Sequence, residues 1–161
     1  MTAGTGGPLK VFVVAGEPSG DALGTKLMRS LRTSRWNVRF VGVGGAGMES
    51  EGLQSLFPMA DIAVMGFLPV LRRLPTLLER IRRTAAAAIA EAPDVVVLID
   101  SPDFTHRVAR KIRAAVPSVP IIDYVSPTVW GWRPGRARAM RAYFDHVLAV
   151  LPFEPAAHAR L

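Results

Sequence analysis

Three acidic residues stand where the sequence could carry out acid–base chemistry. Asp100 and Asp103 follow the apolar run Val95–Ile99, and Glu17 follows a similar run at Lys10–Ala15. A carboxylate at the end of a strand can take a proton from a hydroxyl, contact a ligand or cap a helix. Asp103 suits the N-cap of the helix expected after it, so capping explains Asp103 well. Capping explains Asp100 less well, so base and ligand contact both remain open roles for Asp100.

The turn after the first apolar run holds further candidates for ligand contact. Ser19 and Asp21 can cap the helix that follows, and Gly20 can let a ligand approach closely. Glu17 would repel a pyrophosphate at the start of that helix. The Gly42–Gly47 segment has the G-x-G-x-x-G spacing of dinucleotide-binding proteins, but it follows the second strand instead of the first. Binding of NAD is therefore not expected.

The sequence predicts neither a metal site nor a cofactor. The three His residues are scattered and Cys is absent. Asp100 and Asp103 could hold a magnesium ion, but no phosphate-binding loop accompanies them. Sequences typical of P-loop enzymes, zinc peptidases and serine hydrolases do not occur.

A loop with two Trp residues follows the strand expected at Pro120–Tyr124. Its candidate substrate contacts are Ser126, Trp130 and Arg133. The Trp rings could stack on a sugar or cover an acyl chain, and packing on the next helix explains them equally well. Arg133 and Arg136 are spaced to share a helix face and could hold a phosphate. A solvated basic face is the alternative.

The segment Ile62–Arg83 interleaves large apolar residues with Arg over too much circumference for one core-facing stripe. This pattern is typical of a helix in a membrane interface, with apolar side chains among acyl chains and Arg at lipid phosphates. A helix that packs on a sheet and has a basic outer face fits equally well. The candidate membrane-contacting residues are Val64, Met65, Phe67, Leu68, Leu71, Arg72 and Arg73.

Bulk properties favour one folded domain with an acidic partner. The chain has 161 residues, half of them hydrophobic, and a net charge of +7. All basic residues except Lys10, Lys26 and Lys111 are Arg, whose planar fork binds phosphates. An anionic membrane, a phosphorylated substrate, a nucleotide and nucleic acid are all compatible with this charge. Met1–Pro8 lacks the pattern of a signal peptide, and no apolar run reaches membrane-spanning length.

Strands and helices alternate along the chain, which predicts a doubly wound, mostly parallel α/β sheet of Rossmann-like type. If the common strand order holds, the first strand lies beside the strand that ends at Asp100, and Glu17 and Asp100 face one crevice. Leu53–Phe57 and Asp61–Met65 are short, and one of them is a candidate third strand. The other expected strands are 10–15, 38–43, 95–99, 120–124 and 145–151, and the expected helices are 22–32, 67–92, 104–115 and 135–143.

Six ordered motifs together resemble the lipid-A-disaccharide synthase family. The resemblance implies the amino-terminal domain of a GT-B glycosyltransferase. It also implies transfer of 2,3-diacylglucosamine from UDP to 2,3-diacylglucosamine 1-phosphate (lipid X), with inversion and release of UDP and without a metal. The motifs are Val-Ala-Gly-Glu17-Pro-Ser-Gly-Asp21, Phe40-Val-Gly-Val-Gly-Gly, Ala63-Val-Met-Gly66, Ile99-Asp100-Ser-Pro-Asp103-Phe104, Tyr124-Val-Ser-Pro-Thr-Val-Trp-Gly-Trp-Arg133 and Leu151-Pro-Phe-Glu154.

The resemblance places the family's proposed base on Asp100, its crevice glutamate on Glu17 and its membrane-docking region on Ile62–Arg83. It implies a peripheral protein on the cytoplasmic face of the inner membrane and leaves room for a homodimer. We expect a flexible segment at 1–9, an acceptor-side domain at 10–161 and no carboxyl-terminal nucleotide-sugar domain. The alternative is an inactive module that binds anionic membrane or phosphoglycolipid. A nucleic-acid-binding domain ranks last, because no matching motif is present.

Overall fold

The computed structural model describes residues 7–34, 37–63, 67–127 and 134–159, without the side chains of 67–70, 134, 136, 137 and 157. Its described sheet has five parallel strands in the order β2-β1-β3-β4-β5, so the predicted doubly wound α/β class is confirmed. The strands are β1 (Leu9–Ala15), β2 (Val38–Val43), β3 (Val95–Ile99), β4 (Ile121–Tyr124) and β5 (His146–Leu148).

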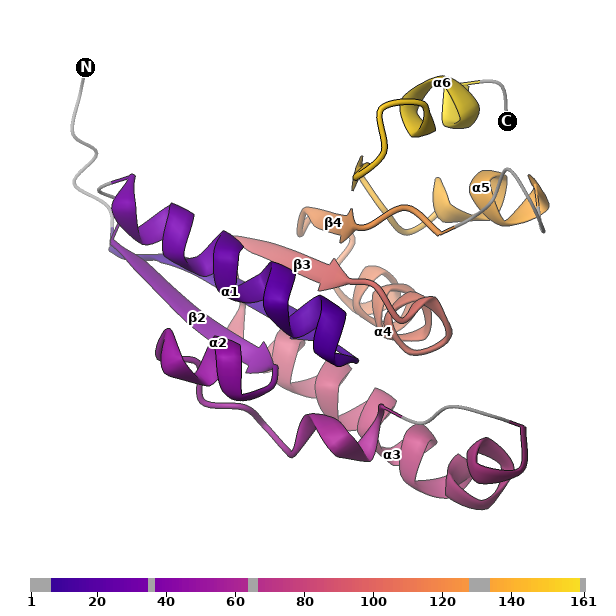
Figure 1. Ribbon diagram of the computed structural model, residues 1–161, viewed down its shortest axis with the longest axis horizontal. Coiled ribbons are helices and arrows are strands. Elements are labelled where there is room, and N and C mark those ends of the chain that lie inside the picture. The colour runs from indigo at the N-terminus through magenta and orange to yellow at the C-terminus, as the bar shows by residue number, and fades with distance from the viewer. Residues whose placement is uncertain (1–6, 35–36, 64–66, 128–133, 160–161) are drawn as a thin grey trace.

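Helices cover both faces of this sheet (Figure 1). The three longest helices occupy the places that the apolar periodicity predicted, each starting or ending within a few residues of the expected position. The helices are α1 (Pro18–Thr33), α2 (Ala46–Ser50), α3 (Phe67–Glu91), α4 (Pro102–Ala115), α5 (Pro134–Met140) and α6 (Glu154–Ala159), with a 3₁₀ turn, η1, at Met59–Asp61.

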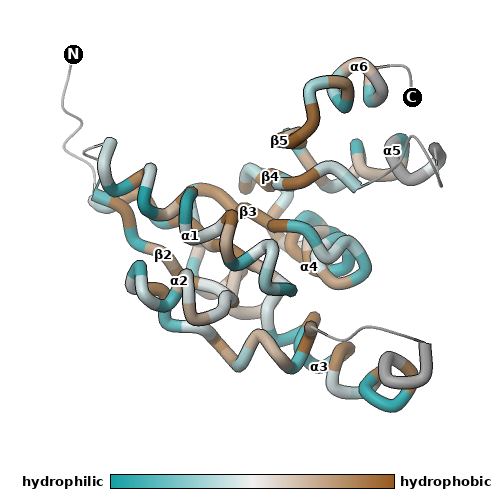
Figure 2. The backbone as a smooth tube through the Cα atoms, in the orientation of Figure 1, coloured by the Kyte–Doolittle hydropathy of each residue, from teal (hydrophilic) through white to brown (hydrophobic). Residues whose placement is uncertain are grey.

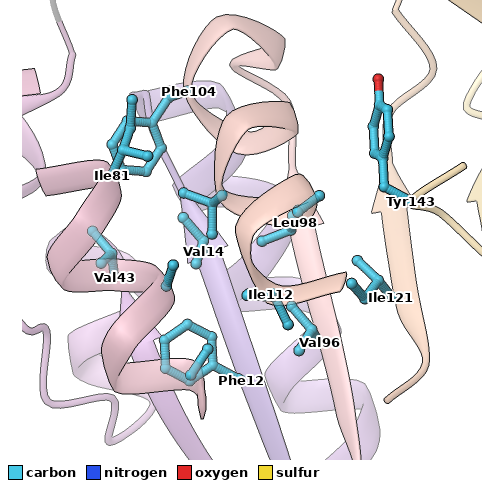
Figure 3. Packing of buried hydrophobic residues seen from close by; sticks show 14 of the residues in the cluster. Phe12, Val14, Val43, Ile81, Val96, Leu98, Phe104, Ile112, Ile121 and Tyr143 are labelled. Carbon is cyan, nitrogen blue, oxygen red and sulfur yellow. The ribbon is translucent and has the colours of Figure 1, made fainter. Parts of the chain in front are cut away.

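Alternation along β1 divides the core into two layers. Phe12 and Val14 point to the face covered by α3 and α4, where they pack with Ile81 and Phe104 (Figure 3). Val11, Val13 and Ala15, which alternate with these residues along β1, point to the other face, against α1 and α2. The β3 segment between these layers is among the most hydrophobic parts of the chain (Figure 2). Both faces of β1 and β3 are buried, as expected for central parallel strands.

The candidate third strand is wrong for the described residues. The segment 53–57 contributes only an isolated bridge between Ser55 and Gly42, and the start of the second segment is the η1 turn. Leu53, Phe57 and Ile62 are all buried, and Pro58 cannot donate a ladder hydrogen bond. These residues therefore cover the edge of the core instead of extending the sheet.

Two helix starts also differ from prediction, because each helix begins at a proline in its first turn. Helix α1 begins at Pro18 and α4 at Pro102, where the fixed backbone angle of proline favours helix entry. Asp103 therefore lies inside the first turn of α4, and Ser101 occupies the N-cap position without a capping side-chain bond. The predicted capping role of Asp103 is wrong.

Candidate active site

The candidate site lies at the carboxyl edge of the sheet, where β1, β3 and β4 end side by side. The register pairs Ala15 with Ile99 and Ile99 with Tyr124, so the three strands end at one level. Residues that follow these strands come out along a single edge. In open α/β sheets this edge is where ligands bind.

Asp100 turns away from β3 in a left-handed backbone conformation. The φ angles of Asp100 and Ser101 are 55° and 48°, and Val125, which follows β4, has a φ of 86°. Such angles are unfavourable for non-glycine residues, most of all for a β-branched one, and they gather at functional sites. The amide of Asp100 donates to the Tyr124 carbonyl at 3.0 Å, and Thr105 Oγ1 donates to the Asp100 carbonyl at 2.8 Å. These bonds fix the direction of the turn.

The Asp100 carboxylate is not fully used in holding its own loop. Oδ1 accepts one hydrogen bond from the Ser101 amide at 2.8 Å, which leaves most of the four lone-pair sites of a carboxylate. The side chain is half-buried and lies within hydrogen-bonding reach of Glu17. The predicted proximity of Glu17 and Asp100 is therefore confirmed, and both carboxylates belong to one site.

Glu17 occupies the turn between β1 and α1, and its side chain is held on both sides. Hydrogen bonding with Asp100 raises the pKa of Glu17, while a 2.8 Å hydrogen bond from Ser19 Oγ lowers it and partial burial raises it. The net direction is upward. As the pH falls, Glu17 takes up a proton earlier than an ordinary glutamate and can then donate it to Asp100.

Gly16 allows the two turns to lie this close. A Cβ atom at Gly16 would lie 2.5 Å from Ser101 Oγ and 2.7 Å from Ser101 Cβ. Rotation of Ser101 can relieve the first contact but not the second, because Cβ is fixed by the backbone. A residue with a side chain at position 16 would therefore push the Asp100 turn away from Glu17.

We expect Gly16→Ala to destabilise the chain by about 1–3 kcal/mol, the usual effect of forcing an extra methyl group into a packed site. Urea unfolding of the two proteins measures this difference. Gly7→Ala is the matched control, because nothing lies within 4 Å of the Cβ it would add, and it should leave stability unchanged. Equal stabilities for Gly16→Ala and Gly7→Ala would contradict the close approach of the two turns.

The remaining predicted contacts have structural partners at this edge. Gly20 is buried, and a Cβ there would lie 3.3 Å from the Ile99 carbonyl, so helix–strand packing explains this glycine. Ser126 is buried, with Oγ 2.5 Å from His158 Nε2 on α6. Asp103 is exposed on the first turn of α4. Their ligand contacts stay predictions, and Trp130, Arg133, Val64 and Met65 lie outside the described residues.

Asp21 does not cap its own helix. Its Oδ1 accepts from the Gly45 and Met48 amides at 2.9 and 3.0 Å, and Oδ2 accepts from the Gly47 amide at 2.9 Å. Asp21 thus caps α2 from the neighbouring helix α1. Because an aspartate already occupies these amides, the glycine segment at 42–47 does not offer them to a phosphate.

Two buried polar residues at this edge were missed by sequence reasoning. Asp123 on β4 is 1% exposed, and His106 on α4 is 5% exposed. Desolvation and, secondarily, the charge of Asp100 raise the pKa of Asp123 to about 8. Alternation along β4 places Asp123 on the face of Ile121, which is a core position. A polar residue at a core position of a strand was the available signal.

Helix α3 packs on the sheet with one half and exposes apolar and basic side chains with the other, and membrane contact of the segment Ile62–Arg83 stays a prediction. Its carboxyl-terminal half packs on the sheet through Ile81 and the alanines that follow. Its amino-terminal part extends beyond the sheet at the lower right of Figure 1. Here Leu71, Leu74 and Leu78 are 55%, 40% and 41% exposed, and they recur at the spacing of one helix face. Arg72 and Arg73 are exposed beside them; Phe67 and Leu68 belong to α3, but their side chains are not described.

The exposed leucines lead into a cationic groove between α3 and α4. The groove has a volume of about 410 Å³, and neither Asp100 nor Glu17 lines it. Its apolar wall continues the leucine stripe from Leu78, and its rim carries four positively charged side chains. The lining residues are Leu78, Ile81, Arg82, Arg107, Arg110 and Lys111.

No group of three or more His, Cys, Asp or Glu side chains that could hold a metal ion occurs among the described residues. The Glu17 and Asp100 carboxyl groups at the sheet edge lie close enough to exchange a proton with each other. This arrangement is suited to general-base chemistry.

Comparison with known proteins gives one consistent family. The family model described as lipid-A-disaccharide synthetase matches residues 11–160. A lipid-A-disaccharide synthase of Nitrobacter hamburgensis is 61% identical over 153 residues, which cover 94% of this chain and 39% of the relative. A protein of the same name from Rhodopseudomonas palustris strain HaA2 is 56% identical, with 99% and 41% covered. One from Ruegeria pomeroyi is 54% identical, with 91% and 36% covered. The chain thus spans about two fifths of the length of these relatives.

Proposed function

Because this chain belongs to the lipid-A-disaccharide synthetase family, we propose that it supplies the acceptor side of a glycosyltransferase in lipid A biosynthesis. The donor is UDP-2,3-diacylglucosamine, the acceptor is lipid X, and UDP is the leaving group. One observation carries the proposal: Asp100 and Glu17 meet at the carboxyl edge of the sheet, and each belongs to one of the family motifs. The remaining contacts proposed at this edge are Ser19, Gly20, Asp103, Ser126, Trp130 and Arg133.

In the proposed reaction Asp100 is the general base. The acceptor hydroxyl is a weak nucleophile, and a carboxylate within hydrogen-bond reach takes its proton as the oxygen attacks the anomeric carbon of the donor. The new bond joins that oxygen to the anomeric carbon, and the bond to UDP breaks with its electrons on the departing phosphate. Attack opposite the leaving group inverts the anomeric carbon. Glu17 positions Asp100 through the hydrogen bond between their side chains.

A chimaera tests this assignment directly. In it, this chain replaces the matching 39% of the Nitrobacter hamburgensis protein, and mass spectrometry follows disaccharide formation from UDP-2,3-diacylglucosamine and lipid X. We expect turnover comparable with that of the parent protein. A folded chimaera that binds both substrates but forms no disaccharide would contradict the proposal.

The pH profile of the chimaera should report the Glu17–Asp100 pair. Glu17 has a raised pKa, so kcat/KM should begin to fall, as the pH decreases, above the pH at which an ordinary glutamate titrates. In Glu17→Gln the side-chain amide can always donate a hydrogen bond to Asp100, so this variant imitates the protonated form of Glu17. We expect its rate at neutral pH to fall several-fold and this inflection to disappear, as measured by kcat/KM between pH 4.5 and 8, in about half-unit steps.

Ser19→Ala provides the matched control for this profile. The Ser19 hydroxyl stabilises the Glu17 anion, so its loss should move the inflection to higher pH without removing it. If the inflection moved to lower pH, or stayed where it was in both variants, Glu17 would not be the group that titrates.

The proposed membrane partner is an anionic bilayer surface, contacted by Leu71, Arg72 and Arg73 and by the four residues that precede them in the prediction: Val64, Met65, Phe67 and Leu68. Support comes from the exposed leucine stripe and the cationic groove, which offer apolar contact and phosphate contact on one side of the molecule. Within the described part of the chain, no helix is both long enough and apolar enough to span a bilayer. Attachment to the cytoplasmic face of the inner membrane is the proposed location.

A second function is favoured by the same stripe: the chain alone binds anionic lipid or phosphoglycolipid without turnover. Activity of the chimaera together with inactivity and lipid binding of the separate chain would support this module. A homodimer is a further proposal, and light scattering at several concentrations decides it.

A further inference from the structure

A series of polar side chains, most of them buried, lies beneath the candidate base. Asp123 Oδ2 is 3.9 Å from His106 Nε2, and His106 Nδ1 is 3.1 Å from the Tyr143 hydroxyl. Arg110 Nη2 lies 3.5 Å from the same hydroxyl, and its guanidinium lies 4.9 Å from the Tyr143 ring centre. Asp123, His106 and Tyr143 are all buried, whereas Arg110 is exposed. This series of side chains therefore runs from the sheet edge to the surface of α4.

Aromatic packing holds His106 in its place between Asp123 and Tyr143. The imidazole meets Tyr143 and Phe144 edge-on, with ring centres 5.6 and 5.1 Å apart. Tyr143 belongs to the core cluster, and its hydroxyl points away from Ile121 at the start of β4 (Figure 3). The ring nitrogens of His106 are thus fixed between a carboxyl group and a phenol.

The geometry favours one proton in total on Asp123 and His106, whose facing atoms are 3.9 Å apart and form an ion-pair contact, not a hydrogen bond. Arg110 can only donate, so the Tyr143 oxygen accepts from it. If His106 Nδ1 also donates to that oxygen, Nε2 is left as an acceptor that faces Asp123. Two negatively charged or two unprotonated groups at 3.9 Å in a dry core are unfavourable. A carboxylic acid beside a neutral imidazole, or its ion-pair form, has no net charge and avoids that penalty.

We propose that Asp123 and His106 together carry one proton beneath the active site, on one residue or the other, and that this shared proton lets Asp100 face the acceptor without a second negative charge behind it. The role rests on the proposed function of Asp100 as base. Asp123 and His106 are positioning residues, since they act through Asp100 and not on the substrate. The register places Asp123 opposite Leu98, two residues before Asp100.

Charged and titratable groups lie on each element near the pair. They include Asp100 after β3, with Glu17 beyond it, Arg110 on α4, Tyr143 after α5, His146 on β5 and His158 on α6. Asp100 is the group whose charge acts on Asp123. Loss of the shared proton therefore places two carboxylates against each other at the edge where a phosphorylated acceptor must bind.

NMR of this chain tests the shared proton without any turnover. With carboxyl-labelled aspartate, we expect Asp123 to titrate near pH 8, consistent with its raised pKa, and Asp100 to show a second inflection at the same pH. Asp123→Asn keeps the shape of the side chain, and in this variant the inflection at Asp100 should vanish. An Asp123 signal that titrates near its ordinary pH, or an Asp100 signal without the second inflection, would overturn the proposal.

Stability supplies an independent measurement on the same chain. Because folding raises the pKa of Asp123 from 3.8 to about 8, the native state holds a proton that the unfolded state has lost between those values. The stability tied to this proton is fully present below pH 3.8 and is lost as the pH rises toward 8. The urea midpoint of the wild type should therefore fall over this range relative to that of Asp123→Asn. Parallel curves for the two proteins would contradict the shared proton.

Kinetics of the chimaera separate this inference from the proposed function. Above pH 8 the KM for lipid X should rise several-fold in the wild type, with kcat nearly unchanged, because the acceptor phosphate meets added negative charge. In Asp123→Asn the KM should stay level. An inactive chimaera whose chain still shows the coupled NMR titrations would refute the proposed function and leave the shared proton established. An active chimaera with a level KM would refute the positioning role alone.

Discussion

Asp100→Asn is expected to lower disaccharide formation by the chimaera by a factor of about 10²–10⁴, the usual contribution of a positioned general base. The amide keeps the size of the side chain and can still contact Glu17, so the loss reports the proton acceptor and not the packing. Single-turnover rates measured by mass spectrometry separate this chemical step from substrate binding.

Glu49→Gln is the matched control for this experiment. It also removes one negative charge, from an exposed position on α2 that is not among the proposed contacts, and its effect on the rate should stay within a few-fold. Unfolding curves of both variants verify that the fold is intact. Similar rates for the two variants, whether both high or both low, would remove Asp100 from its proposed role.

Reversal of two charges on α3 should release the chain from anionic membranes. Each basic residue near such a surface contributes about 1 kcal/mol, so Arg72→Glu with Arg73→Glu should lower partitioning by about 30-fold or more. Co-sedimentation with vesicles of equal parts phosphatidylglycerol and phosphatidylcholine measures this change. The effect should shrink in high salt, because the charges are exposed.

Arg138→Glu with Arg141→Glu is the control, since both residues are exposed and the net charge changes by the same amount. Arg138 belongs to α5 and Arg141 follows that helix, so both lie outside the leucine stripe of α3. Reversal of their charges should lower membrane binding much less. Equal losses in the two double variants would mean that net charge, and not the α3 surface, governs binding. Leu71→Ser then tests the apolar contribution, which should persist in high salt.

The parts of the fold that depend on local pattern were predictable from sequence. Unbroken apolar runs mark β1 and β3 as central strands, and the period of the helices is visible in their apolar residues. Adjacency of β1 and β3 follows from the common order of doubly wound sheets, and it brings Glu17 to Asp100. The proximity of Glu17 and Asp100 was therefore predictable from the sequence alone.

The parts that depend on tertiary contact were not predictable from local pattern. Asp21 caps a helix 24 residues or more further along the chain, which no helix-start rule anticipates. The segment 53–57 has strand-like composition, but it covers the core edge. His106 and Tyr143 are 37 residues apart in sequence, so their contact with each other depends on how α4 and the segment after α5 pack. The site beneath Asp100 is thus a property of the packed fold.

One measurement tests the central claim, that the acceptor meets Asp100 and Glu17 at the carboxyl edge of the sheet. Carboxyl-labelled chain is titrated with lipid X below its aggregation concentration, and the side-chain signals are followed by NMR. We predict saturable shifts at Asp100 and Glu17, with no shift at Asp145, which bonds the Ile121 amide at the opposite end of β4. Saturable binding of lipid X that leaves Asp100 and Glu17 unshifted would contradict the account.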